Sequence, residues 1–290
     1  MNLSIAHLGP PGNYSEQAAL FYIEWLTKTR AETAILCPYP SIAQSIKAVA
    51  EGQVKLAVVP AENSIEGSVT MTMDAMWQLD NLQISLALVM PIVHVLISCA
   101  TDLENIQTVY SHPQALAQCQ RWLERFLPNV QTIATNSTTE ALQRLETDLS
   151  AAAISSQRAA QLYHLPVLAR DINDSPENCT RFWVVSQNSN VESFLASPMN
   201  ASHTSFAFSV PANVPGALAK TLQVFAHLGI NLSRIESRPT KRSLGEYLFF
   251  IDIEASIHQP LMQSALRELL NYTEVLKIFG SYNVLSTDAI

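Results

Sequence analysis

Short apolar runs alternate with amphipathic stretches from residue 3 to about residue 186. The first apolar runs are Leu3–Leu8, Ala34–Pro38 and Leu56–Val59, and amphipathic stretches that begin at Ser15 and Ser41 separate them. This alternation is typical of βαβ units and predicts a mostly parallel sheet.

The same rhythm repeats in the next part of the chain. Strands are expected at Val93–Ser98, Thr108–Tyr110, Val130–Ala134 and Ala152–Ile154, and helices at Pro113–Phe126, Ser137–Glu146 and Ser156–Tyr163. This repetition predicts two αβ lobes of similar size, with the second at about residues 80–172. Because Asp171–Val185 is too short for a third lobe, we expect it to return to the first lobe and close a cleft between the two.

The segment Leu82–Ala100 is apolar and long enough to suggest a transmembrane helix. Polar residues and a proline interrupt it, namely Gln83, Ser85, Pro91, His94 and Ser98. Proline removes a backbone donor and marks a boundary, so two buried strands that separate at Met90-Pro91 are the better interpretation.

The pattern changes after residue 186. Residues 187–203 are polar and rich in Ser and Asn, which indicates a linker. Beyond it the expected order is strand Thr204–Val210, helix Pro215–Leu228, strands Asn231–Arg238 and Glu246–Glu254, helix Gln259–Leu270 and strand Val275–Tyr282. This order is the ferredoxin-like βαββαβ unit. Within its first helix Leu218, Leu222, Phe225 and Leu228 recur at helical spacing and predict a core face.

Composition narrows the class of protein. The chain has 290 residues, of which 48% are hydrophobic and 14% charged, with a net charge of −8. Such a chain is globular, and its scattered Lys and Arg residues provide no basic surface for nucleic acid or an anionic membrane. The N-terminal residues lack a basic leader, and the four cysteines show no C-x-x-C pair and no Cys/His spacing suited to zinc. We therefore expect reduced thiols and a cytoplasmic protein.

Four polar clusters follow apolar runs and contain, or lie close to, Pro or Gly. They are Gly9–Glu16, Pro60–Ser64, Ser111–Gln114 and Asn178–Phe182. In α/β folds such loop ends gather where ligands bind. Each cluster taken alone is also explained by local capping and backbone hydrogen bonds. The threonine hydroxyl at position 180 does not ionise near neutral pH, so it would act by hydrogen bonding to a departing oxygen.

Other site types find little support. The Gly9–Gly12 turn lacks the G-x-G-x-x-G pattern of a dinucleotide site, and no G-x-S-x-G elbow accompanies Ser111 and His112. Most histidines, His94 among them, stand singly and are interpreted as structural or surface residues. We expect no metal and no cofactor.

Taken together, the clusters and their neighbours closely resemble the motifs of the prephenate dehydratase family. The stretches that carry the resemblance are Gly9–Ala19, Pro60–Val69, Ser111–Cys119 and Asn178–Phe182. The C-terminal unit resembles the family's ACT regulatory module through Gly216-Ala217-Leu218 and Ile235–Pro239. Two departures are Gly12–Ser15, where the family commonly has Gly-Thr-Phe-Ser, and Asn136–Thr138, where it has Thr-Ser-Thr.

The resemblance implies an α/β fold. It consists of a two-lobed, periplasmic-binding-protein-like catalytic domain at residues 1–186 and a ferredoxin-like ACT domain at residues 204–290, joined by the linker 187–203. No chorismate mutase helix bundle is recognisable, so a monofunctional carbon–oxygen lyase is expected.

The resemblance also implies residue roles. Thr180 would assist the leaving hydroxyl of prephenate, and the other catalytic candidates, which would hold substrate oxygens, are Asn63, Ser111 and Gln118. Arg181 would favour the anionic substrate. The full set of expected substrate-binding residues is Ser15, Glu62, Ser64, Asn178, Arg181 and Phe182.

Regulation by L-phenylalanine is implied by the ACT-like unit. The effector would bind between a loop of one chain and a strand of its dimer partner, in a homodimer or homotetramer formed through ACT domains. The residues expected there are Asn213, Pro215, Gly216, Ala217, Leu218, Glu236, Ser237, Arg238 and Pro239. Two alternatives stay open, arogenate dehydratase and an amino-acid sensor without catalysis.

Overall fold

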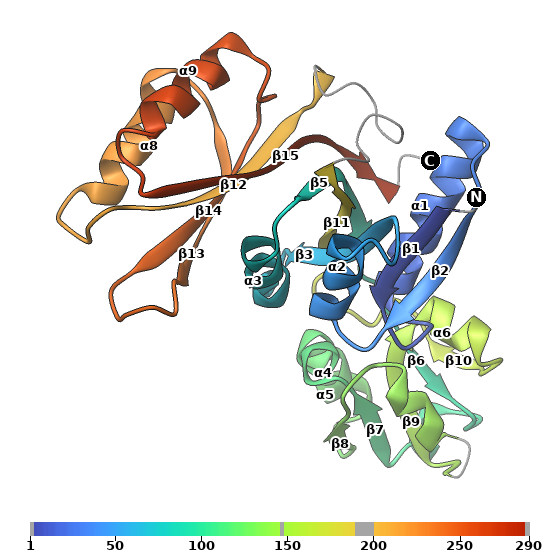
Figure 1. Cartoon of the computed structure of the whole chain (residues 1–290). Helices are drawn as coiled ribbons and strands as arrows, with labels where there is room; N and C mark the ends of the chain where they lie inside the picture. Colours follow the sequence, from blue (N-terminus) through green and yellow to red (C-terminus); the bar gives the residue numbers. More distant parts are fainter. Residues whose placement is uncertain (1–2, 146–147, 189–199, 288–290) are drawn as a thin grey trace.

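The computed structural model describes residues 3–145, 148–188 and 200–287. Two α/β lobes and a C-terminal α/β domain make up the protein (Figure 1). Each lobe is built around its own sheet, and the C-terminal domain continues the sheet of the first lobe.

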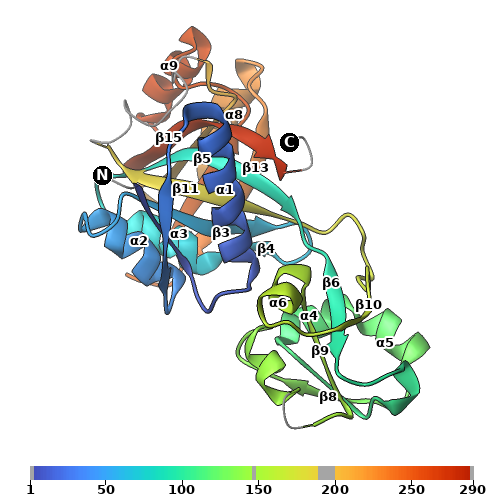
Figure 2. The ribbon, with the colours of Figure 1, turned by 90° about the vertical axis from the view of Figure 1, so that its right-hand side faces the viewer.

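The first lobe has helices on both faces of a mixed sheet. Its strands are β1 (Leu3–Leu8), β2 (Ala34–Tyr39), β3 (Leu56–Asn63), β4 (Gly67–Ser68), β5 (Leu82–Pro91) and β11 (Cys179–Gln187). Helix α1 (Tyr14–Arg30) covers one face, and α2 (Ile42–Ala50) and α3 (Thr70–Gln78) cover the other (Figure 2). Side-chain caps begin α1 and α2, since Asn13 accepts from the amide of Glu16 and Ser41 from that of Gln44.

The expectation of a mostly parallel sheet is wrong for the centre of this lobe. Strand β1 is parallel to β2 and β3, but β11 is antiparallel to both β3 and β5. The reason is the path of the chain, because β11 returns from the second lobe in the opposite direction to β3. The start of β11 therefore lies beside the end of β3, and two of the polar clusters meet there.

The second lobe contains a five-stranded sheet in the order β10-β6-β9-β7-β8. Its strands are β6 (His94–Ser98), β7 (Thr108–Ser111), β8 (Gln131–Ala134), β9 (Ala151–Ser156) and β10 (Val167–Ala169). Its helices are α4 (Pro113–Gln118), α5 (Gln120–Phe126) and α6 (Gln157–Leu162), with short 3₁₀ turns at Leu103–Asn105 and Glu140–Arg144. The lobe starts after Pro91 rather than at residue 80, because β5 belongs to the first sheet.

One predicted helix of this lobe is replaced by other structure. Instead of an α-helix over Ser137–Glu146, the described part holds a 3₁₀ turn at Glu140–Arg144. Local side-chain bonds compete with the helix, since Ser137 Oγ accepts from the amide of Glu140 and the Glu140 carboxylate accepts from the amide of Asn136. Residue 146 lies outside the described residues.

Two chain crossings connect the lobes and lie side by side. The amide of Ile92 on the first crossing donates to the carbonyl of Asn178 at 2.8 Å. The side chain of Asn173 on the second crossing accepts from the amide of His94 and donates to the carbonyl of Ile92. The return of Asp171–Val185 to the first lobe is thus confirmed, as are two strands within Leu82–Ala100. Among the described helices, none has the length and apolar character to cross a bilayer.

The C-terminal domain has the predicted βαββαβ order. Its elements are β12 (His203–Ser209), α8 (Ala217–His227), β13 (Leu232–Pro239), β14 (Tyr247–Ile253), α9 (Pro260–Leu269) and β15 (Val275–Ser286). The strands lie in the order β13-β14-β12-β15, and both helices cover one face of the sheet (Figure 1). Leu218, Leu222 and Phe225 of α8, with Leu228 directly after the helix, face its core as predicted. Most of the expected linker, residues 189–199, lies outside the described residues.

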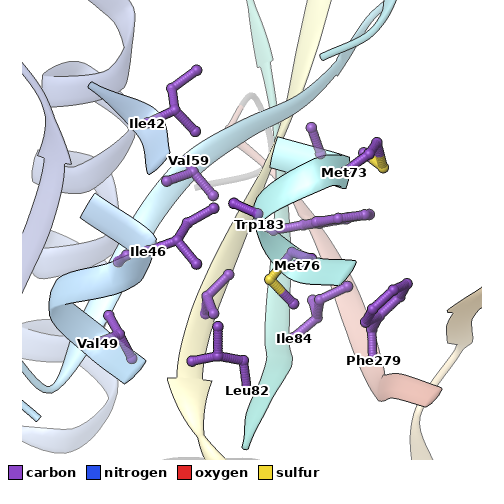
Figure 3. Packing of buried hydrophobic residues seen from close by; sticks show 14 of the residues in the cluster. Ile42, Ile46, Val49, Val59, Met73, Met76, Leu82, Ile84, Trp183 and Phe279 are labelled. Carbon is purple, nitrogen blue, oxygen red and sulfur yellow. The ribbon is translucent and has the colours of Figure 1, made fainter. Parts of the chain in front are cut away.

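The first lobe and the C-terminal domain share a core and a strand. Trp183 of the first lobe and Phe250 and Phe279 of the C-terminal domain belong to one buried apolar cluster, part of which Figure 3 shows. Strand β15 pairs with β12 over its first part, and its last residues, Asn283–Ser286, pair in parallel with β5. The end of the chain therefore forms a strand of the first lobe's sheet.

Gly280 lies where β15 passes from one sheet to the other. Its φ is +136°, and a Cβ atom there would lie 2.7 Å from the carbonyl oxygen of Ile84 on β5. We expect Gly280→Ala to lower the free energy of unfolding by about 1–3 kcal/mol, because alanine is strained at this φ and the backbone of β5 must also move aside. Urea unfolding followed by circular dichroism measures this change.

Gly229 provides a matched control. Its φ is +65°, so alanine is also strained there, but no atom lies within 4 Å of the added Cβ. The Gly229→Ala protein should lose about 1 kcal/mol, the cost of a left-handed backbone alone. Equal losses at the two glycines would show that contact with β5 contributes nothing.

Candidate active site

A cavity of about 900 Å³ lies between the two lobes and contains several of the predicted residues. The first lobe contributes side chains from the start of α1, the end of β3 and the start of β11. The second lobe contributes the start of β6, helix α4 and the segment before the second 3₁₀ turn. Predicted site residues that line the cavity are Ser15, Asn63, Gln118, Thr180 and Phe182.

Alternation along β11 separates Thr180 from Arg181. Thr180 and Phe182 line the cavity, whereas Arg181 is absent from its lining. Successive side chains of a strand point to opposite faces, so Arg181 faces the C-terminal domain. Its Nη1 lies 3.2 Å from a carboxylate oxygen of Asp252 and 3.5 Å from one of Glu62. The structure therefore places Arg181 and Glu62 in an interdomain contact, where the sequence predicted substrate contacts.

The orientation of the Asn63 side chain determines what the hydroxyl of Thr180 can do. The Asn63 Oδ1 atom accepts from the amides of Ile65 and Glu66, at 3.0 and 3.1 Å. Its Nδ2 atom therefore faces Thr180 and donates to Oγ1 at 2.9 Å. Because Thr180 Oγ1 accepts in this bond, its own hydrogen is left to donate to an acceptor in the cavity. The pair thus presents an oriented donor to a departing oxygen.

Asn178 and Gln118 continue the polar network into the second lobe. Asn178 is 1% exposed, and its Oδ1 accepts from Asn63 Nδ2 at 2.9 Å. Its Nδ2 donates to Gln118 Oε1 at 3.0 Å. Ser64 also belongs to this network, since its Oγ accepts from the amide of Cys179 and donates to Oδ1 of Asn178. Asn178 and Ser64 thus hold the site together without lining the cavity.

Ser111 does not reach the cavity, contrary to the prediction that it holds a substrate oxygen. Its side chain is fully buried, and Oγ donates to the carbonyl of Ile154 at 2.6 Å. This bond ties β7 to β9, so the hydroxyl is engaged in structure. The neighbouring His112 lines the cavity instead. The cavity is also lined by Asn136, Ser137 and Thr138, the motif in which this chain differs from the common family pattern.

The lining of the cavity is mostly uncharged. Within the described residues it contains no lysine or arginine, and Glu140 is its carboxylate. Helix α1 starts at Tyr14, and Asn13, Tyr14 and Ser15 line the cavity, so the positive dipole end of the helix lies beside it. No group of His, Cys, Asp or Glu among the described residues is arranged to hold a metal ion.

His94 and Tyr14 line the cavity, although no separate role was predicted for either of them. His94 is 2% exposed, and its two ring nitrogens each lie 3.0 Å from a partner, Gln118 Oε1 and the hydroxyl of Tyr14. Burial lowers the pKa of His94, so its neutral form is favoured. Its partners lie 24 and 80 residues away in sequence, so no local signal at position 94 could have revealed this role.

The predicted effector residues lie on the C-terminal domain. Asn213, Pro215 and Gly216 are exposed in the loop before α8, with Ala217 and Leu218 half-buried at the start of the helix. Residues 236–239 end β13, which is the edge strand of the sheet. Arg238 of this segment bonds Asp74 of α3 at 3.3 Å. The structure describes one chain, so a site shared between two chains stays a prediction.

A buried ionic cluster joins the C-terminal domain to the first lobe beside Thr180. Asp252 of β14 is fully buried and lies 2.8 Å from Nε of Arg234 as well as 3.2 Å from Arg181. Arg234 also donates to Ser68 Oγ at 2.9 Å and lies over the ring of Trp183. Strands β3, β4 and β11 of the first lobe are thereby tied to β13 and β14.

Fold and site together define a class, a two-lobed α/β protein with a ligand cavity between its lobes and a ferredoxin-like domain attached to one of them. A sequence model of the prephenate dehydratase family matches residues 5–190, and one of the ACT domain matches residues 204–271. The chain belongs to the prephenate dehydratase family.

Relatives support this membership over almost the whole chain. The bifunctional chorismate mutase/prephenate dehydratase of Aquifex aeolicus is 39% identical over 97% of this chain and 73% of its own length. The prephenate dehydratase of Lactococcus lactis subsp. cremoris is 35% identical over 98% and 99%. The crystal structure of prephenate dehydratase from Arthrobacter aurescens in complex with L-Phe has a TM-score of 0.85 and 34% identity, covering 97% of this chain and 90% of that one.

Proposed function

We propose that the protein is a carbon–oxygen lyase that converts prephenate into phenylpyruvate, water and carbon dioxide. The observation that carries the proposal is the Thr180 hydroxyl, which accepts from Asn63 and has its hydrogen free to donate into the interlobe cavity. Membership of the prephenate dehydratase family supports the choice of substrate. Catalysis would take place in residues 1–186, and regulation in residues 204–290.

The reaction needs one proton and no redox partner. The bond from the ring to its carboxylate breaks, and its electron pair enters the ring as carbon dioxide leaves. The ring hydroxyl departs with a proton from Thr180, giving water and an aromatic ring, and Thr180 then recovers a proton from solvent. A threonine is too weak an acid to protonate the hydroxyl in advance, so transfer accompanies departure.

The cavity would bind and enclose the dianionic substrate. Hydroxyl and amide donors from both lobes, with the start of α1, would hold its carboxylates and orient its ring hydroxyl toward Thr180. Gln118 uses its oxygen toward Asn178 and His94, so its amide nitrogen is the atom that would bind substrate. Exclusion of water by the two lobes would strengthen these hydrogen bonds.

We further propose that L-phenylalanine inhibits the enzyme through the ACT domain. The ACT match and the related crystal structure with bound L-Phe support this effector. A homodimer or homotetramer would place the loop at residues 213–218 against residues 236–239 of a second chain, since the edge strand β13 is open to pairing. A cytoplasmic location is proposed on the free cysteines and the biosynthetic reaction.

Turnover of purified protein tests both proposals. Prephenate should yield phenylpyruvate, and L-phenylalanine should lower the rate. By linkage, prephenate must then weaken L-phenylalanine binding by the same factor by which L-phenylalanine weakens prephenate binding, if inhibition acts on affinity, and titration calorimetry measures this. Conversion of arogenate but not prephenate would move the assignment to arogenate dehydratase. No turnover of either compound by folded protein would overturn the enzyme assignment.

A further inference from the structure

His94 occupies a position from which it can act on both lobes. It lies at the start of β6, directly after the first crossing, and lines the interlobe cavity. One ring nitrogen reaches Tyr14 of the first lobe and the other reaches Gln118 of the second. A buried histidine with both nitrogens engaged has a defined ring orientation and, where its partners are fixed, a defined tautomer.

The tautomer of His94 follows from the polar network on the Gln118 side. Backbone amides fix Oδ1 of Asn63, so its Nδ2 donates to Asn178 Oδ1. Asn178 Nδ2 then donates to Gln118 Oε1, and this same oxygen lies 3.0 Å from His94 Nε2. A carbonyl oxygen only accepts, so Nε2 must carry a hydrogen. The backbone at one end of the chain of amides thus determines the proton position at the other.

The other ring nitrogen shares a hydrogen with Tyr14. In the neutral ring with hydrogen on Nε2, Nδ1 has a lone pair that faces the Tyr14 hydroxyl at 3.0 Å. That hydroxyl also lies 2.8 Å from the carbonyl of Val93. Its single hydrogen is therefore shared between the Val93 carbonyl and the Nδ1 lone pair. Burial lowers the pKa of His94 and so disfavours the charged ring that a hydrogen on both nitrogens would require.

We propose that His94, as its neutral Nε2–H tautomer, is a positioning residue for the reaction. Its Nε2–H holds the oxygen of Gln118, which fixes the amide of Asn178, which in turn keeps Asn63 in place to bond Thr180. One directed chain of hydrogen bonds thus extends from the crossing between the lobes to the hydroxyl that assists the leaving group. The inference rests on the proposed prephenate dehydratase activity.

Two substitutions separate this role from space filling. His94→Gln places an amide donor near the position of Nε2–H, whereas His94→Leu fills similar space without a donor. We expect the leucine protein to lose about tenfold or more in kcat, the scale of one lost orienting hydrogen bond. We expect the kcat of the glutamine protein to stay within about threefold of the parent value. In both variants KM should change less than kcat. Thermal unfolding of both variants checks that they are folded.

The kcat values of the two variants test whether His94 acts as a hydrogen-bond donor. Equal loss in the two variants, or a fully active leucine protein, would overturn the proposal. The parent protein is measured first, because failure of the parent to convert prephenate would contradict the proposed function and not the hydrogen-bond chain.

A measurement on the parent protein needs no turnover. Isotope-labelled histidine gives imidazole nitrogen shifts that distinguish the two neutral tautomers, and the seven histidines are resolved by comparison with His94→Gln. We expect the Nε2–H form for His94. An Nδ1–H form, or a charged ring at neutral pH, would show that the chain is not directed as proposed, whatever the enzyme's activity.

Discussion

Thr180→Val should leave a folded protein that turns prephenate over about 100-fold more slowly or worse, the usual contribution of a positioned proton donor. Valine has nearly the shape of threonine and suits a strand, so the change removes the hydroxyl and little else. The Asn63 amide then loses its acceptor at position 180. Because the hydroxyl acts as oxygen departs, kcat should fall more than KM rises, and steady-state kinetics with prephenate separate the two.

Two companion variants sharpen this test. Thr180→Ser keeps a hydroxyl and should lose about tenfold less activity than the valine protein, because the donor is present but less restrained. Thr132→Val makes the same substitution at an exposed site of β8, outside the cavity lining, and should leave turnover unchanged. If a folded Thr180→Val protein had a near-normal kcat, Thr180 would not be the proton donor to the leaving hydroxyl.

Asp252→Ala should lower the free energy of unfolding by about 3–5 kcal/mol, as expected when one partner of a buried ion pair is removed. Asp252 is fully buried between the domains, and its loss leaves the guanidinium of Arg234, 7% exposed, without that carboxylate. Arg181 keeps Glu62 at 3.5 Å, so most of the cost falls on Arg234. Urea unfolding measures the loss.

Asp74 is the matched control for this prediction. It also joins the C-terminal domain to the first lobe, through Arg238 and Lys241, but its side chain is 25% exposed and its pairs are screened by solvent. Asp74→Ala should cost less than about 1 kcal/mol. If the two variants lost equal stability, the burial of Asp252 would not explain the loss in the Asp252→Ala protein.

The sequence predicted the fold well because local signals and tertiary packing agree for most elements. Apolar runs and turn residues located β1, β5 and β6, and helical spacing located the core face of α8. The predicted helix over Ser137–Glu146 failed where polar side chains bond the nearby backbone, a competition that periodicity does not register. The antiparallel direction of β11 depends on the path between lobes, which no local pattern contains.

The site was predicted in part for a similar reason. Motif resemblance brought Asn63, Gln118 and Thr180 to one cavity, but it could not say which way each side chain points. Alternation along β11 would have sent Arg181 away from Thr180 once the strand was accepted. His94 could not be chosen among the histidines, because its partners are 24 and 80 residues distant in sequence.

Strand β15 makes the first part of the chain depend on the last. During synthesis the first lobe emerges early, yet the outer edge of β5 has no partner until residues 283–286 appear. A nascent chain therefore carries an open strand edge until residues 283–286 have been made, and such edges favour pairing with other chains. The sheet of the first lobe is therefore completed only when the last strand of the C-terminal domain has been made.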